Sequence, residues 1–176
     1  MTTTEDARLG RLLPDGGVQF VRHLKHQPAK VWRALTEGEH LVHWFPTDLV
    51  VVGGERVPGA ELELPFWPRQ VERWQIDEPV THGELVAWEE PTLLEWIWEG
   101  DRLRWELEPH DGGTRLVLST WFGEPGEEYL TKSGAGYHLC LAMLEELLDT
   151  GEVGYLEDAR IAATEEEYRA VATRSA

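Results

Sequence analysis

Cys140, the only cysteine in the chain, follows His138 by two positions in the segment GYHLCLAMLEELL (136–148). A thiol beside an imidazole suggests a nucleophile with an activating base. On a helix, however, residues two apart are separated by about 200°, so these side chains point to nearly opposite faces and cannot act as a pair. Cys140 falls instead in an apolar stripe with Tyr137 and four leucines, which predicts a small, buried hydrophobic residue.

His138 is therefore left as a weak candidate for a general base. It lies about 100° around the helix from Tyr137, on the flank that carries Glu145 and Asp149. The near-neutral reference pKa of histidine suits proton transfer if that flank borders a cavity. The alternative is a structural or exposed histidine without a catalytic role.

The seven histidines do not form a metal-binding pattern. His40 and His43 have a spacing that can hold a metal on a helix, but a third ligand would have to come from elsewhere in the chain. The sequence also lacks a strand followed by Gly-x-Gly-x-x-Gly, a P-loop and a Gly-x-Ser-x-Gly elbow. We therefore expect no metal and no cofactor.

The nine tryptophans are the strongest indication of a binding surface. Trp96 and Trp98 share one face of a predicted strand, and Trp105 lies on the apolar face of the next one. If these faces point inward, the rings form the floor of a pocket suited to a flat aromatic or polycyclic molecule. The alternative is a bulky core that holds no ligand.

Alternating and helical hydrophobic patterns predict the elements that must position these residues. Short turns between consecutive strands indicate an antiparallel sheet, and helices gathered on one side of it indicate the α+β class. Strands are expected at 18–24, 49–57, 60–66, 83–90, 93–99, 102–108 and 110–122. Helices are expected as a pair within 27–45, at about 134–149, and weakly around 164–172, where Thr164 is a candidate cap.

The charged residues of the strands fall mostly on the face opposite the apolar one, and we expect that face to be solvated. An inward-facing glutamate would be desolvated, its pKa would rise, and it would become a catalytic candidate. The strand residues concerned are Glu63, Glu84, Glu95 and Arg104.

The overall composition favours one globular domain and excludes some partners. The net charge of -17 argues against nucleic acids and against anionic membrane surfaces. A single cysteine fits a reducing compartment, and the sequence shows neither a signal peptide nor a stretch of about 20 apolar residues. A cytoplasmic protein is the expectation.

Four stretches in this order resemble the SRPBCC superfamily (START-related, Bet v 1-like), and within it the branch related to the activator of Hsp90 ATPase. Together they cover about residues 18–150, whereas 67–80 and the tail after Gly151 do not align with the family pattern. The four stretches are PAKVWRALTEGEHLVHWF (28–45), GELVAWEEPTLLEWIW (83–98), GGTRLVLSTWF (112–122) and GAGYHLCLAMLEELL (134–148).

The resemblance implies a helix-grip fold, in which a curved antiparallel sheet of about six to seven strands wraps around a long C-terminal helix. We expect an N-terminal arm (1–17), the helix-grip domain (18–150) and a partly helical tail (151–176). A cavity between the sheet and the helix is also implied. The residues that we expect to line it are Trp96, Trp98, Trp105, Leu118, Tyr137 and Leu141, with Trp44, Phe45 and Trp67 near its mouth.

Three functions are compatible with this resemblance. The first is binding of a hydrophobic or aromatic small molecule in the cavity. The second is a polyketide cyclase/dehydratase-like reaction in the same cavity, for which His138 or Tyr137 would supply the polar group. The third is a protein-interaction module of the Hsp90-activator kind, with a chaperone or a second copy of the chain as partner.

Overall fold

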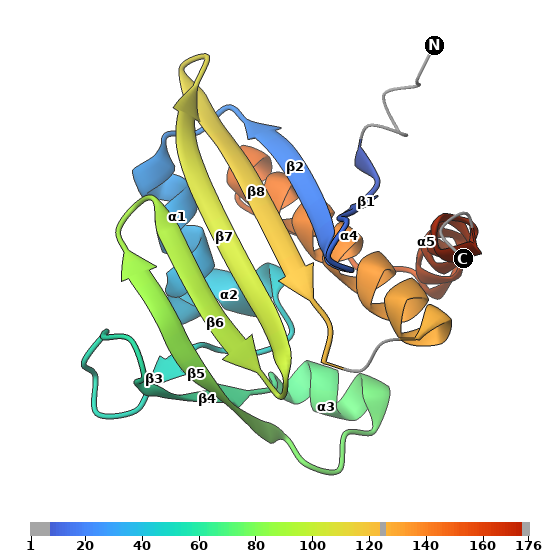
Figure 1. Ribbon diagram of the computed structural model, residues 1–176, viewed down its shortest axis with the longest axis horizontal. Helices are drawn as coiled ribbons and strands as arrows, with labels where there is room; N and C mark the ends of the chain where they lie inside the picture. Colours follow the sequence, from blue (N-terminus) through green and yellow to red (C-terminus); the bar gives the residue numbers. More distant parts are fainter. Residues whose placement is uncertain (1–7, 124–125, 174–176) are drawn as a thin grey trace.

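The computed structural model describes residues 8–123 and 126–173, which form an eight-stranded antiparallel sheet with helices on one face (Figure 1). The strand order is β1-β2-β8-β7-β6-β5-β4-β3. The strands are β1 (Arg11–Leu12), β2 (Val18–Leu24), β3 (Val50–Val51), β4 (Glu61–Pro65), β5 (Val80–Glu89), β6 (Leu93–Trp98), β7 (Asp101–His110) and β8 (Gly113–Trp121). The predicted α+β helix-grip class is confirmed, with eight strands instead of six to seven.

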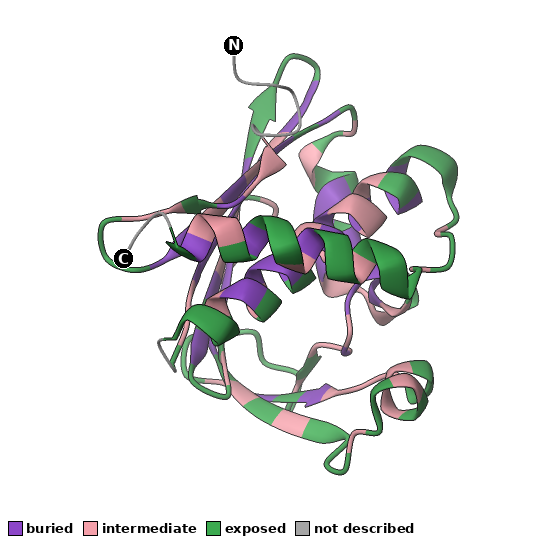
Figure 2. Cartoon of the chain, turned by 90° about the vertical axis from the view of Figure 1, so that its right-hand side faces the viewer, coloured by how far each residue is buried: buried purple, intermediate pink, exposed green. Residues whose placement is uncertain are grey.

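The helices form a second layer that covers one face of the sheet. They are α1 (Pro28–Thr36), α2 (Gly38–Trp44), α3 (Pro68–Trp74), α4 (Glu127–Thr150) and α5 (Asp158–Thr173). Figure 2 shows the sheet from the side, with the helices next to it and buried residues where the two layers meet. None of the helices within the described ranges has the length and apolar character needed to cross a membrane.

The core consists of the inward face of the sheet and the residues of α1, α2 and α4 that press on it. In the β6–β7 pair, Trp96 lies opposite Leu103 and Leu94 lies opposite Trp105, and all four are buried. The rings of Trp96 and Trp105 stack at 6.0 Å, and Trp44 from α2 meets Trp105 edge-on at 5.9 Å. The inward orientation predicted for Trp96 and Trp105 is therefore confirmed.

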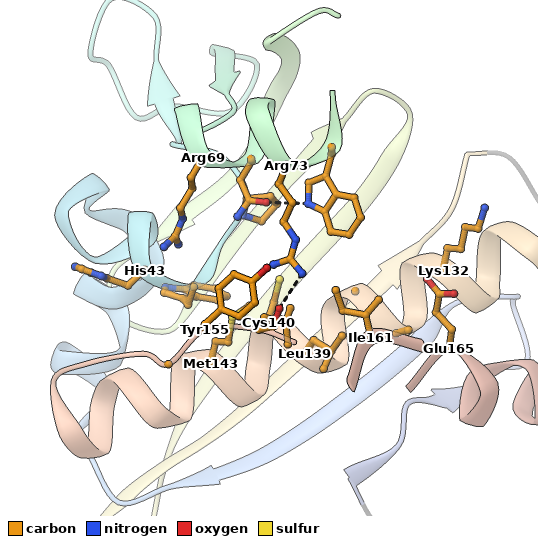
Figure 3. A pocket seen from close by; sticks show the side chains of 18 of the residues that line it. His43, Arg69, Arg73, Lys132, Leu139, Cys140, Met143, Tyr155, Ile161 and Glu165 are labelled. Carbon is orange, nitrogen blue, oxygen red and sulfur yellow. Dashed lines mark hydrogen bonds between the residues drawn. The ribbon is translucent and has the colours of Figure 1, made fainter. Parts of the chain in front are cut away.

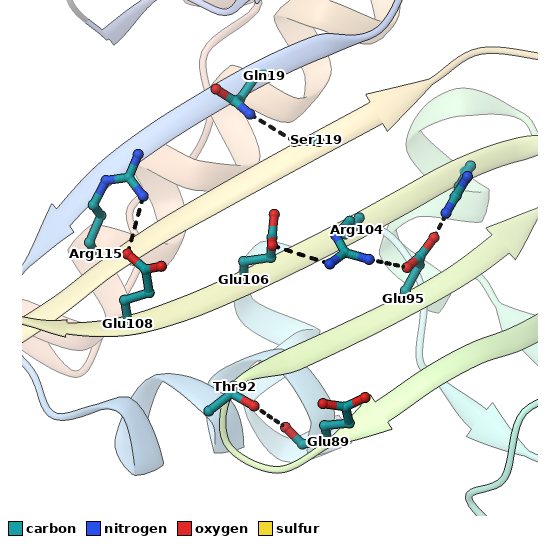
Figure 4. A network of polar contacts seen from close by, with 10 residues as sticks. Gln19, Glu89, Thr92, Glu95, Arg104, Glu106, Glu108, Arg115 and Ser119 are labelled. Atoms are coloured by element: carbon teal, nitrogen blue, oxygen red, sulfur yellow. Dashed lines mark hydrogen bonds and ion pairs between the residues drawn. The ribbon is translucent and has the colours of Figure 1, made fainter.

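The outward face of the sheet is polar, but one of its residues is not solvated as expected. Glu95 is only 2% exposed because Arg102 and Arg104 cover it (Figure 4). The Nη1 of Arg104 donates a hydrogen bond of 2.8 Å to one Glu95 oxygen, and the Nε of Arg102 donates to the other. This carboxylate points away from the core and is paired with two cations, so it is not a catalytic candidate.

Three of the expected elements need correction. The β-branched run 49–57 forms a strand only at Val50–Val51, because Gly53 and Gly54 turn the chain with positive φ. The long helix α4 begins at Glu127, seven residues before the expected start. Thr164 is not a cap, since it lies inside α5 and its hydroxyl donates to the carbonyl of Arg160.

A glycine on α4 allows α5 to pack closely against it. A Cβ on Gly134 would lie 2.6 Å from a ring carbon of Tyr168, which is closer than atoms can approach without a shift. The Tyr168 hydroxyl in turn accepts a hydrogen bond of 2.7 Å from the backbone N–H of Gly10. Parts of the predicted arm and tail are thus joined to each other beside α4.

A pair of substitutions on α4 tests this packing. We expect Gly134→Ala to lower the free energy of unfolding by about 1 kcal/mol, because overpacking against Tyr168 outweighs the gain in helix propensity. Gly136→Ala, where the added Cβ meets nothing within 4 Å, should raise it by about 0.5–1 kcal/mol. Urea denaturation measures both, and equal effects of the two substitutions would contradict the packing described.

Candidate functional site

Two cavities lie beside α4, and they share the lining residues Pro46, Gly136 and Cys140. The inner cavity, of about 370 Å³, lies between the sheet and the first half of α4. The outer pocket, of about 470 Å³, lies between α3, α4 and the chain after α4 (Figure 3). Either volume is large enough for a small organic molecule.

Five aromatic rings line the inner cavity. Phe45, which follows α2, contacts the ring of Trp98 at 5.8 Å, and Phe66, which follows β4, contacts the same ring at 6.1 Å. Tyr129 and Tyr137 close the opposite wall from α4. These rings come from four separate segments, which the curved sheet and α4 bring together.

The polar groups of the inner cavity are acidic or neutral. Asp101 accepts a hydrogen bond of 2.8 Å from the Tyr129 hydroxyl and one of 2.9 Å from the Gly123 N–H. The indole N–H of Trp98 donates to the Thr81 hydroxyl at 2.8 Å. Glu99 also lines the cavity, and no Lys, Arg or His is found among its described lining residues.

Tyr137 is buried and places its phenol ring in the inner cavity. Burial first, and then the nearby Asp101 carboxylate, raise the pKa of Tyr137 well above its usual value of 10. The hydroxyl therefore stays protonated at neutral pH. It is suited to donate a hydrogen bond and unsuited to act as a base.

Cys140 lines both cavities, yet its thiol is not activated. Burial raises the pKa of Cys140 to about 12, so almost no thiolate exists at neutral pH. Cys140 packs against the core as a hydrophobic residue, but it is only partly buried, which corrects the expectation of full burial. Its thiol gives no support to a nucleophile.

The nine predicted ligand-binding residues fall into three groups. Phe45, Trp98 and Tyr137 line the inner cavity, and Trp44 lines the outer pocket. Trp67 lines neither, and its indole N–H donates to the Phe45 carbonyl at 3.0 Å. The remaining four are at most 2% exposed and line neither cavity, so their contact with a ligand stays a prediction: Trp96, Trp105, Leu118 and Leu141.

Several residues that line the inner cavity were not predicted from the sequence. Asp101 begins β7, and Tyr129 and Ser133 lie on the early turns of α4, far away in the chain. Their meeting depends on where α4 crosses the sheet, which no local pattern encodes. The one available signal was Gly136, a residue without a side chain next to an inward-facing tyrosine.

His138 lies on the other side of α4 from the inner cavity and lines neither of the two cavities. The Tyr168 hydroxyl accepts from Gly10, so its own proton is free to be donated to Nδ1 of His138, 3.1 Å away. Burial and the positive charges of Arg22, Arg8 and Arg160 lower the pKa of His138 from 6.5 to about 4. The ring is a neutral acceptor, and its surroundings give no support to a general base.

One group of possible metal ligands occurs among the described residues. Glu37, Glu39 and His40 place ligand atoms within 4.8 Å of one another near the start of α2. Glu39 is exposed and the other two are partly buried, and Nε2 of His40 lies 3.5 Å from a Glu37 carboxylate oxygen, an ordinary surface contact. His43 instead lines the outer pocket.

Comparison with known proteins places this geometry in a family. The family model described as "Activator of Hsp90 ATPase homolog 1-like protein" matches residues 25–149. No curated protein is significantly similar to the chain.

Solved structures share the fold at low sequence identity. A conserved protein of unknown function, EF2215 from Enterococcus faecalis, is 19% identical with a TM-score of 0.72, covering 94% of this chain and 90% of that one. CalU16 from Micromonospora echinospora is 18% identical with a TM-score of 0.65, covering 94% and 95%. The chain of an Aha1 dimer from Colwellia psychrerythraea is 15% identical with a TM-score of 0.60, covering 77% and 97%. At such identities the likeness establishes the fold alone.

The surroundings of His138 predict a specific pH dependence of stability. Because the folded pKa is near 4 and the unfolded one near 6.5, the unfolded chain takes up a proton first as the pH falls. The contribution of His138 to the free energy of unfolding is fully present above pH 6.5 and is lost as the pH falls towards 4. The expected loss is about 2 kcal/mol after allowance for the partial exposure of the ring. Urea denaturation at pH 7, 6, 5 and 4.5 measures this loss.

The substitution His138→Gln should remove this pH-dependent loss of stability. The control His82→Gln, at an exposed histidine, should leave the loss unchanged. A wild-type protein and a His138→Gln variant with parallel pH profiles would contradict the assignment. Both variants keep all Asp and Glu residues, so the loss of stability caused by protonation of these carboxylates is the same in each and cancels in the comparison.

Proposed function

The chain belongs to the activator of Hsp90 ATPase homolog 1-like family, and from this premise we propose that its inner cavity binds a flat, neutral or cationic aromatic molecule. The observation that carries the proposal is the lining itself. Five aromatic rings surround a space of about 370 Å³, and the charged side chains among the described lining residues are all acidic.

The shape of the inner cavity favours a planar ring system. The rings of Phe45 and Phe66 are tilted against that of Trp98, at centroid separations of 5.8 Å and 6.1 Å. Aromatic pairs of this kind gain about 0.5–1.5 kcal/mol beyond the burial of apolar area. A planar ligand adds further contacts of the same type without requiring the walls to move.

The charge of the inner cavity selects against anions. Asp101 and Glu99 would repel a carboxylate or phosphate, whereas a cationic ring would be attracted by them and by the faces of Trp98 and the tyrosines. Tyr137 supplies a protonated hydroxyl that can donate to a carbonyl or ring nitrogen of the ligand. The site therefore favours a neutral or cationic molecule over a fatty acid.

The enzymatic alternative keeps one candidate residue. A cyclase/dehydratase-like reaction needs a group that polarises a carbonyl, and the protonated Tyr137 beside Asp101 has this chemistry. His138 is no longer the first choice because it packs against α5 and away from both cavities. Tyr137→Phe should abolish such a reaction while leaving binding of an apolar molecule in place.

The protein-interaction alternative rests on the family description and on the dimer found for the Colwellia protein. Association with a chaperone, or of two copies, would use an outer surface and would not depend on the volume of the inner cavity. A cytoplasmic location, which the single cysteine favours, fits all of these functions.

Filling the inner cavity tests the proposed function. Ser133→Phe places a ring in the inner cavity from α4, and Ser133→Ala removes the hydroxyl at the same position without filling space. Titration with the neutral, polarity-sensitive dye Nile red should give one site for the wild type and for Ser133→Ala. Ser133→Phe should weaken the binding of Nile red at least about tenfold, which corresponds to a loss of ~1.4 kcal/mol in binding free energy.

Thermal unfolding shows whether both variants are folded. Equal Nile red affinity of the folded Ser133→Phe and Ser133→Ala proteins would contradict binding in the inner cavity. The same titration with a long-chain fatty acid as competitor should show weak competition, because the acidic residues of the cavity disfavour its carboxylate.

A further inference from the structure

Two walls of the outer pocket come from segments that showed no resemblance in the sequence, although the family model, which matches residues 25–149, includes the first of them. One is α3, within 67–80, and the other is the chain after Gly151, which contributes residues 154–156 and the first part of α5. Between them, α4 provides an apolar floor with Leu139 and Met143 (Figure 3). Segments far apart in sequence thus meet at a cavity of about 470 Å³.

Arg73 joins the two walls of the outer pocket. Its Nη2 donates a hydrogen bond of 2.8 Å to the Leu156 carbonyl and one of 2.5 Å to the Asp158 carboxylate. Its guanidinium lies 5.0 Å from the ring centroid of Trp74 on α3 and 5.0 Å from that of Tyr155. The pocket therefore has walls fixed by hydrogen bonds and cation–π contacts before any ligand binds.

Two large aromatic side chains at this pocket remain open to solvent. Tyr155 is 73% exposed and Trp74 is 53% exposed, compared with 38% for Tyr129 at the inner cavity. Core packing does not explain rings held in such positions beside a cavity. Exposed aromatic side chains next to an apolar floor are typical of surfaces that stack on a ligand.

The charges of the outer pocket differ from those of the inner cavity. Arg69 and His43 lie together at one end, close to Arg73, and Lys132 lies beside Glu165 at the other end (Figure 3). Arg69 donates through Nη2 to the Val42 carbonyl, which orients its guanidinium. Glu72 and Glu165 also line the pocket, so its charge is mixed, and Arg69 is the cation at the end that His43 shares.

We propose that the outer pocket is a second small-molecule site, which takes an aromatic anion. The ring system lies on the floor of Leu139 and Met143 and against Tyr155, and the anionic group points towards Arg69 and His43. In a chain with a net charge of -17, an anion needs a local cation to bind, and Arg69 supplies one at this end of the pocket. This site is independent of the inner cavity, and either could exist without the other.

The aromatic sulfonate 1-anilinonaphthalene-8-sulfonate is a direct probe, because its fluorescence rises in apolar sites and its sulfonate is an anion. Titration of the full chain should give one dye per chain. Arg69→Glu should weaken the dye at least about tenfold, while Arg33→Glu, an equal charge change at an exposed position on α1, should leave the dissociation constant within about twofold. Equal effects of the two charge reversals would overturn the proposal.

Two further variants keep the test decisive if Arg69→Glu disturbs the fold. Because Tyr155 is 73% exposed, Tyr155→Ala should preserve the fold, and it should weaken the binding of the dye several-fold. Ser133→Phe, which fills the inner cavity, should leave the affinity for the sulfonate unchanged. If Ser133→Phe abolishes sulfonate binding and Tyr155→Ala does not, the dye occupies the inner cavity and the outer site is refuted, whatever the outcome with Nile red.

Discussion

The packing of α4 against the sheet is the constraint on which the rest of the structure depends. In its second half, Leu141, Leu144 and Leu148 are buried and fill the space down to the strands. In its first half Tyr137 is also buried, but the small residues Ser133 and Gly136 line the inner cavity and do not fill it. Because a helix is stiff, the space left there is not closed, and the inner cavity lies beside this part of α4. The outer pocket lies on the side of α4 that faces α3 and α5 and extends as far as Met143.

The two cavities beside α4 differ in charge, and this difference determines their chemistry. The inner cavity combines aromatic walls with Asp101 and Glu99, whereas the outer pocket combines an apolar floor with Arg69, since Arg73 is paired with Asp158. Elsewhere the positive charges of the sheet are taken up by carboxylates, as with Glu95 beneath its two arginines. Charged side chains that border a cavity are the ones available to select a ligand.

Local patterns in the sequence predicted most of the elements and only part of the site. Alternation along the strands correctly gave the inward face of Trp96 and Trp105, but it could not show that Trp44 from α2 would cover them. Phe45 and Trp98 line the inner cavity as expected because they lie at the ends of their elements. Depth of burial depends on the opposing layer, which periodicity does not describe.

Contacts between distant segments explain the remaining differences. The position of α5, fixed against α4 through Gly134, places Tyr168 over His138 and removes that histidine from the catalytic candidates. The outer pocket exists because Arg73 of α3 reaches the backbone of Leu156, more than eighty residues later in the chain. Neither contact leaves a periodic signal, and α5 lies outside residues 25–149, which the family model matches.

Native mass spectrometry of the protein purified from its own host tests the central claim most directly. The account predicts a population that carries one small molecule per chain, released on unfolding, with the absorbance of an aromatic ring system and a neutral or positive charge. A chain that is bare in every preparation, or that retains only an aliphatic acid, would contradict an inner cavity built to bind aromatic molecules.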